Sequence, residues 1–284
     1  MKNYLRILLI LLCAPVFARE MHDVPYHALP NVDPQLLSMD IYWPSASRDK
    51  DVVIMIHGGS WQRGDKTNNY IAGTKVDYFT GKGIVYVATN YRLSPAVKMP
   101  EHPRDVARAI AHVHSLLPDA RIWLVGHSSG AHLAALVATN EAFLGEQGLD
   151  LRVLSGVVCL DTKYVDVLAN SRLRTFNRVF IDKVFGDDRS VWNQVDPIQH
   201  IAPDKGIPPI LLFFTEQRLR KKINEKFAAT LARAGVPSRA ILARGYDHKL
   251  MIVDFGSPGD PLTGLVGRFI DREDVRAFPG AIRR

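Results

Sequence analysis

The sequence predicts an α/β fold in which a mostly parallel central sheet is flanked by helices. Several short runs are apolar along their whole length, as parallel strands are when helices cover both faces of the sheet. Segments with helical character separate these runs, and this alternation is typical of βαβ connections. The chain has 284 residues, of which 47% are hydrophobic, so one large core can form. We therefore expect a single domain over residues 19–284, without internal repeats.

The elements of the first half of the chain alternate in type. The clearest strand is the run Val52 to Ile56, because a continuously apolar strand has to be buried on both faces. In order, the expected elements are a strand from Leu37 to Trp43, a strand from Asp51 to Ile56, a helix near Asn69 to Gly81, a strand from Ile84 to Asn90 and a helix from Arg104 to Leu117.

The second half continues this pattern around one longer segment. A short, partly aromatic strand from Arg121 to Val125 precedes an alanine-rich helix from His132 to Thr139. The segment from Asp161 to Pro203 has mixed charge and no clear strand pattern, so we expect a cap-like or lid insertion there. The other expected elements are strands from Leu154 to Leu160, from Ile210 to Phe214 and from Arg239 to Ala243, and a helix from Asn224 to Leu231.

The pentapeptide Gly126-His127-Ser128-Ser129-Gly130 lies between an expected strand and an expected helix. In a G-x-S-x-G turn the serine hydroxyl is raised toward substrate, and the flanking glycines allow the two backbones to approach closely. Ser128 is therefore the candidate nucleophile. An oxyanion-binding loop is expected upstream, where a buried strand runs into His57-Gly58-Gly59-Ser60-Trp61. The expected donors to the oxyanion are the backbone amides of Gly59, Ser60 and Ser129.

The candidate general base is His248, which follows the strand Arg239 to Ala243. Imidazole can accept the serine proton and return it near neutral pH. The acid that orients this histidine is expected after the strand Ile210 to Phe214, where Glu216 is the available carboxylate. Asp247 is the competing candidate, although it directly precedes His248 and its side chain is expected to point away from the imidazole.

These motifs, together with Asn90-Tyr91-Arg92-Leu93-Ser94-Pro95, resemble the α/β-hydrolase superfamily over essentially the whole chain. The H-G-G-x-W loop followed by Gly64-Asp65-Lys66 is similar to the carboxylesterase, feruloyl-esterase-like and kynurenine-formamidase-like branch. The segment from Gln217 to Lys222 is unusually basic for that pattern. The resemblance implies an α/β-hydrolase fold, with Glu216 at the position that matches the acid of formamidase-like relatives.

The residues and the resemblance together predict a serine hydrolase that works through an acyl-enzyme. By resemblance, the expected substrate is a carboxylic ester with a small or medium acyl group, and hydrolysis of an aryl formamide such as N-formylkynurenine is the alternative. A non-catalytic relative that binds ligands or proteins is the alternative from another class. No cofactor is expected, and the histidines and cysteines lack the spacing of a metal site.

The first 18 residues resemble an export signal. Lys2 and Arg6 precede an apolar run, and Val16-Phe17-Ala18 is typical of a cleavage site, so a periplasmic or secreted protein without stable membrane insertion is expected. An uncleaved anchor is the alternative. Cleavage would lower the net charge from +7 to 7 − 2 = +5, a moderate value that does not indicate nucleic-acid binding. The sequence does not predict the oligomeric state.

Overall fold

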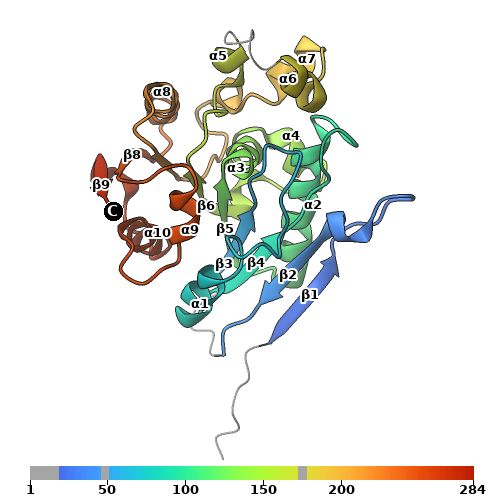
Figure 1. Ribbon diagram of the computed structural model, residues 1–284, viewed down its shortest axis with the longest axis horizontal. Helices are drawn as coiled ribbons and strands as arrows, with labels where there is room; N and C mark the ends of the chain where they lie inside the picture. The colour runs from blue at the N-terminus through green and yellow to red at the C-terminus, as the bar shows by residue number, and fades with distance from the viewer. Residues whose placement is uncertain (1–18, 46–50, 172–177) are drawn as a thin grey trace, which may run out of the picture.

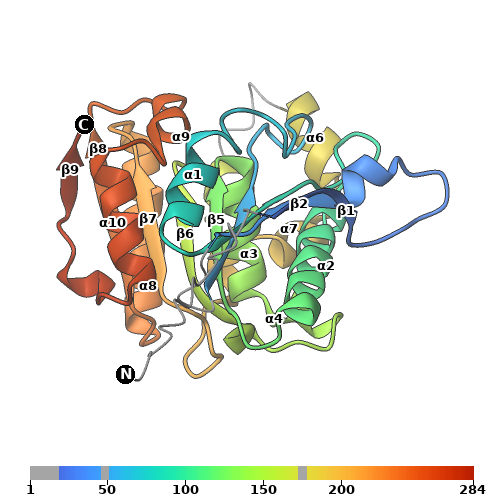
Figure 2. The same cartoon turned by 90° about the horizontal axis from the view of Figure 1, so that it is seen from below.

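The computed structural model describes residues 19–45, 51–171 and 178–284. Nine strands in these ranges form one sheet in the order β1-β2-β4-β3-β5-β6-β7-β8-β9. Figure 2 shows β9 and the C-terminus at one edge of this sheet and β1 near the other. The strands are β1 (Glu20–Pro25), β2 (Ser38–Tyr42), β3 (Asp51–Ile56), β4 (Val85–Thr89), β5 (Arg121–His127), β6 (Leu154–Leu160), β7 (Ile210–Phe214), β8 (Ser238–Arg244) and β9 (Ala281–Arg283).

The sheet is mostly parallel, as predicted. Only the pairs β1/β2 and β2/β4 are antiparallel, and all pairs from β4 to β9 are parallel. Parallel strands place their carboxyl ends at one edge, where the loops that follow β3, β5, β6, β7 and β8 come together. This edge is therefore the place to look for a functional site.

Helices cover both faces of the sheet, and each face has its own hydrophobic cluster. Along β3, Val52, Ile54 and Ile56 belong to one cluster, whereas Val53 and Met55 belong to the other. Helices α2, α3, α4 and α8 pack on the first face, and α1, α9 and α10 on the second. Their bounds are α1 (Thr74–Gly81), α2 (Glu101–Leu116), α3 (Ser129–Thr139), α4 (Glu141–Gly145), α8 (Arg218–Arg233), α9 (Leu250–Asp254) and α10 (Pro261–Ile270).

The segment between β6 and β7 is helical where the structure describes it. It contains α5 (Val167–Ser171), α6 (Arg178–Phe185), α7 (Arg189–Gln194) and a 3-10 turn (Pro197–His200). Figure 1 shows α5, α6 and α7 together at the top of the molecule, beyond α3 and α4. The arrangement of sheet and helices is that of the α/β-hydrolase fold, as the motifs predicted.

One boundary differs from the predictions in a way that matters for the site. Helix α8 begins at Arg218 rather than at Asn224, so the basic segment is its first turn and not a loop. The edge strands β1 and β9 were not predicted. Among the described residues, no helix combines the length and the apolar composition needed to cross a bilayer. The proposed signal segment, residues 1–18, lies outside the described ranges.

Candidate active site

Ser128 occupies the sharp turn between β5 and α3. Its φ of 55° is positive, which is uncommon for a residue with a side chain and marks local backbone strain. The glycines on either side make the turn possible. A Cβ on Gly126 would lie 2.3 Å from the carbonyl oxygen of Gly130, and a Cβ on Gly130 would lie 2.1 Å from that of Ile56. The G-x-S-x-G pattern is therefore required here by backbone contact.

The predicted base lies beside the predicted nucleophile. The distance from Ser128 Oγ to His248 Nε2 is 3.1 Å, and the two residues come from the ends of β5 and β8. On the other side of the ring, His248 Nδ1 donates to Asp161 Oδ2 at 2.6 Å. Because the carboxylate accepts at Nδ1, Nε2 is left with a lone pair to accept the serine proton. The arrangement is a hydroxyl, imidazole and carboxylate relay.

Asp161 is held in place by more than the histidine. Its Oδ1 accepts hydrogen bonds from the backbone N–H of Thr215 at 2.9 Å and from the hydroxyl of that residue at 3.0 Å. Its side chain is completely buried, and Arg220 Nη1 lies 3.1 Å from Oδ2. Burial alone raises the pKa of Asp161, but the hydrogen bond from His248 and the charge of Arg220 outweigh it and hold the pKa below its usual value. The carboxylate is therefore ionised at neutral pH.

The position predicted for the acid is wrong. Glu216 is exposed, lies 3.4 Å from Arg244 and makes no contact with the imidazole. The residue that follows β7 and points into the site is Thr215, which donates to Asp161 from the neighbouring strand. The competing candidate, Asp247, is also excluded, because its Oδ1 accepts the N–H groups of Lys249 and Leu250 at the start of α9.

One feature of the sequence makes Asp161 a candidate for the acid, although Glu216 shares it. Asp161 directly follows the strand Leu154 to Leu160, and that strand lies next to β5 in the sheet. A carboxylate at the carboxyl end of either β6 or β7 can reach the loop that carries His248. Asp161 was instead assigned to the start of the insertion. Its φ of 51° is positive, so the chain turns sharply at this residue.

The loop after β3, where an oxyanion-binding turn was predicted, has an unusual backbone. Gly59, Ser60 and Trp61 all have positive φ, at 124°, 59° and 58°. Within the described ranges, the backbone N–H groups of Gly59, Ser60 and Ser129 donate no hydrogen bond to another protein group. Ser129 N–H is also at the first turn of α3, where helix amides lack internal partners. These three amides are available to a ligand beside Ser128.

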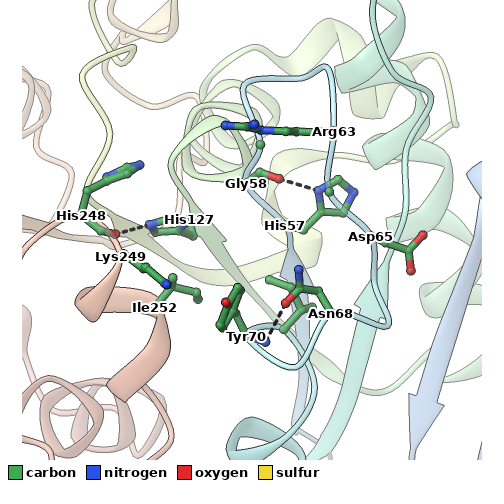
Figure 3. A pocket seen from close by; sticks show the side chains of 13 residues that line it. His57, Gly58, Arg63, Asp65, Asn68, Tyr70, His127, His248, Lys249 and Ile252 are labelled. Carbon is green, nitrogen blue, oxygen red and sulfur yellow. Dashed lines mark hydrogen bonds between the residues drawn. The ribbon is translucent and has the colours of Figure 1, made fainter.

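Buried, neutral histidines brace the loops around the site. His57 stacks on Tyr91 with a ring separation of 4.4 Å and donates from Nδ1 to the Gly58 carbonyl oxygen at 2.8 Å. His127 donates from Nε2 to the carbonyl oxygen of His248 at 2.9 Å, as Figure 3 shows. Burial lowers the pKa of His57 to about 4, and burial together with the adjacent His248 lowers that of His127 to about 3. Both rings are therefore uncharged braces at neutral pH.

Two cavities meet at His248. The first, of about 310 Å³, lies beside the backbone of the histidine and is drawn in Figure 3. The second, of about 330 Å³, contains Ser128 and Asp161 in its wall. The first is lined by His57, Gly58, Gly59, Arg63, Gly64, Asp65, Asn68, Tyr70, Ile71, His127, His248, Lys249 and Ile252. The second is lined by Ser60, Ser128, Asp161, Thr162, Lys163, Tyr164, Arg220 and His248.

An aromatic cluster surrounds Trp61, the residue that follows Ser60. Trp61 is completely buried and packs edge-on against Tyr164 at 4.9 Å, His132 at 5.2 Å and Phe185 at 5.3 Å between ring centroids. Phe185 also contacts Trp192. The insertion therefore packs onto the loop after β3 through these rings, and neither Phe185 nor Trp192 lines the two cavities at His248.

The remaining reactive groups do not form a second centre. Cys159 is buried in β6 and burial raises the pKa of its thiol to about 12, so it packs as a small apolar side chain. The described part of the chain contains no group of three or more histidine, cysteine, aspartate or glutamate side chains that could hold a metal ion.

Comparisons with known proteins agree with this architecture. Residues 39–218, more than half of the chain, match the model of the BD-FAE family. The kynurenine formamidase of Danio rerio is 34% identical over 122 residues, which are 42% of this chain and 39% of that protein. A probable carboxylic ester hydrolase of Mycobacterium tuberculosis, LipM, is 30% identical over 175 residues, which are 57% of this chain and 39% of that protein. The matched region thus spans about two fifths of these relatives.

Solved structures show the same fold at low sequence identity. Esterase B from Lactobacillus rhamnosis superposes with a TM-score of 0.72 and 20% identity, covering 90% of this chain and 86% of that chain. A truncated carbohydrate esterase from gut microbiota superposes with a TM-score of 0.68 and 18% identity, covering 91% and 97% of the two chains. On the match to its family model and the fold, the chain belongs to the BD-FAE family of α/β-hydrolases.

Proposed function

We propose that this protein is a serine hydrolase that cleaves carboxylic esters with a small or medium acyl group. The observation that carries the proposal is the continuous relay from Ser128 Oγ through the imidazole of His248 to Asp161, with separations of 3.1 and 2.6 Å. A hydroxyl becomes a competent nucleophile when an adjacent base accepts its proton and a third group orients that base.

In the proposed reaction, Ser128 Oγ attacks the ester carbonyl carbon while His248 Nε2 accepts the hydroxyl proton. The carbonyl oxygen becomes negative and accepts hydrogen bonds from the amides of Gly59, Ser60 and Ser129. Collapse of the tetrahedral intermediate breaks the ester C–O bond, and His248 returns the proton to the leaving alcohol. Water then attacks the acyl-enzyme with the same histidine as base, releasing the acid and restoring Ser128.

Asp161 has two roles in this scheme. It fixes the tautomer of His248 by accepting at Nδ1, and it stabilises the imidazolium that forms during each proton transfer. Because it is buried and ionised, its charge acts at short range with little screening by water. Glu216, exposed and paired with Arg244, has no part in the proposed mechanism.

The size of the acyl group is inferred from the packing. The cavity at Ser128, of about 330 Å³, is near the lower limit for small-molecule sites, and Tyr164 in its wall packs against the buried Trp61. Relatives that are carboxylic ester hydrolases support ester cleavage. Formamide hydrolysis is a second candidate, because the chain is also similar to kynurenine formamidases and Ser128 could attack a formyl carbonyl in the same way.

The test is turnover of 4-nitrophenyl acetate, butyrate and octanoate beside N-formylkynurenine, with the Ser128→Ala variant as the blank. We expect turnover of acetate and butyrate that the variant lacks, with octanoate slower. A preference for the formamide would move the protein to the second candidate. No turnover of any substrate would refute the hydrolase and favour a ligand-binding or protein-binding role.

We also propose that residues 1–18 are removed on export to the periplasm or the outside of the cell. The support is the basic start, the apolar run and the Val16-Phe17-Ala18 site of the sequence. The mass of the protein recovered from an exporting host tests this. A chain that begins at Arg19 is expected, and an intact N-terminus in the membrane fraction would contradict it.

A further inference from the structure

The cavity beside Ser128 has more positive than negative charge in its wall. Lys163 and Arg220 each contribute +1 and Asp161 contributes −1, which gives 2 − 1 = +1, and the other lining side chains are uncharged when His248 is neutral. The negative charge is already engaged, because Asp161 accepts from His248 and Thr215 and lies against Arg220. A substrate entering this cavity therefore meets an excess of positive charge.

Arg220 is fixed at the cavity wall. Its Nη1 donates to the backbone carbonyl oxygen of Asp161 at 2.6 Å, and its Nε donates to Gln217 Oε1 at 3.0 Å. Among the described residues, none accepts a hydrogen bond from Nη2. The side chain is only 11% exposed, so its charge is held in place and is poorly solvated. A preorganised guanidinium with a free N–H group is suited to bind a carboxylate.

Lys163 brings a second cation to the same cavity. Its Nζ lies over the ring of Tyr164, 5.5 Å from the centroid, next to the catalytic edge of the sheet. Burial lowers the pKa of Lys163, and the charge of Arg220 lowers it further. The two cations therefore repel each other across a shared wall, and an anion between them would relieve this repulsion.

The start of α8 supports the same conclusion. Four basic residues, Arg218, Arg220, Lys221 and Lys222, lie in its first residues, and the first turn contains no acidic side chain. Positive charge at a helix N-terminus is unfavourable, because the helix dipole is positive there. Asp161 already offsets part of this cost for Arg220, the member of the group that reaches the cavity, and a bound anion would offset more of it.

We propose that Lys163 and Arg220 bind a carboxylate of the substrate, so that the preferred esters carry a carboxylate near the scissile bond. This inference rests on the proposed hydrolase function and specifies its substrate class. The carboxylate can belong to the acyl group or to the leaving alcohol, since both parts of an ester lie close to Ser128. In both cases the two cations recognise the same group, a carboxylate.

The experiment compares kcat/KM for matched charged and neutral esters. The acyl arm uses mono-4-nitrophenyl glutarate against 4-nitrophenyl valerate, which has a methyl group in place of the carboxylate. The alcohol arm uses 4-acetoxybenzoate against its methyl ester, and Ser128→Ala supplies the background in both. We expect the charged ester to be preferred by at least about 10-fold in one arm, and this preference to fall with added salt.

Two lysine variants separate a local site from general attraction by a basic protein. Lys163→Gln is expected to reduce the charged-to-neutral ratio of kcat/KM by about 10-fold. Lys221→Gln removes the same charge from an exposed residue of α8 that lies 3.9 Å from Glu225, and it should leave the ratio within about twofold.

The outcomes distinguish the two proposals. Absence of Ser128-dependent turnover of the neutral esters refutes the hydrolase itself. Turnover of neutral esters without a preference for the charged ester in either arm overturns the carboxylate site and leaves the hydrolase standing. Equal effects of the two lysine variants on the ratio would also overturn it, because the attraction would then come from the overall charge.

Discussion

Replacing Asp161 with asparagine should nearly abolish turnover, whereas Glu216→Gln should have little effect. Asparagine keeps the size of the side chain but removes the charge that faces His248 Nδ1 at 2.6 Å. If its amide NH₂ faces the ring, it favours the tautomer in which Nε2 carries the proton and cannot accept one from Ser128. If its oxygen faces the ring, the imidazolium still loses its negative partner.

The expected magnitude follows from this loss. Removing the acid of a Ser-His-Asp triad in this way lowers kcat by roughly 10⁴-fold, which is about 5 kcal/mol of transition-state stabilisation. Glu216 is exposed and paired only with Arg244 at 3.4 Å, so its replacement should change kcat by less than about twofold. The two variants remove the same charge, in one case from a buried residue that contacts His248 and in the other from an exposed residue that does not.

The assay is kcat and KM for 4-nitrophenyl butyrate, with thermal unfolding measured on the same samples. Asp161→Asn also leaves Arg220 without its buried partner, so a loss of about 1–3 kcal/mol of unfolding free energy is expected, and activity is to be measured well below the unfolding temperature. A folded Asp161→Asn variant with near-normal kcat, or a larger loss for Glu216→Gln, would refute this assignment of the acid.

Further predictions concern the nucleophile, the turn and acid stability. Ser128→Ala should abolish ester turnover and leave thermal unfolding nearly unchanged; residual turnover above background would contradict the mechanism. Gly130→Ala should lower the free energy of unfolding in urea by about 2 kcal/mol or more, because its Cβ would lie 2.1 Å from the Ile56 carbonyl oxygen. Gly145→Ala is the control: a Cβ there meets nothing within 4 Å, so this variant should leave the free energy of unfolding nearly unchanged. Burial lowers the pKa of His57 from 6.5 to about 4, so the unfolded chain binds the proton first as pH falls. The contribution of His57 to the free energy of unfolding is present above pH 6.5 and should fall by about 2 kcal/mol by pH 5, and His127 and His132, whose pKa values burial lowers to about 3 and about 4, should add losses of the same sign. An unfolding free energy that does not change between these two pH values would contradict this account of the buried histidines.

The sequence by itself determined the class of fold and two members of the relay. The strands around β3, β5 and β6 could be predicted because parallel strands buried on both faces are continuously apolar, which is a local property of the chain. Ser128 was identifiable because its strained turn requires glycines at fixed spacing, as the contacts of Gly126 and Gly130 show. His248 followed from its place after a late strand.

Only the tertiary structure decided which carboxylate meets His248. Both Asp161 and Glu216 follow core strands, and the sequence contains no local signal that separates them. The choice depends on the backbone turn after β6, on Thr215 donating from β7 and on the partner of Glu216 at the surface. These contacts join segments that are far apart in the chain, so no local periodicity or motif predicts them. The excess of positive charge at the Ser128 cavity has the same origin, because Lys163 follows β6 and Arg220 lies in the first turn of α8, and the two come together only in the folded chain.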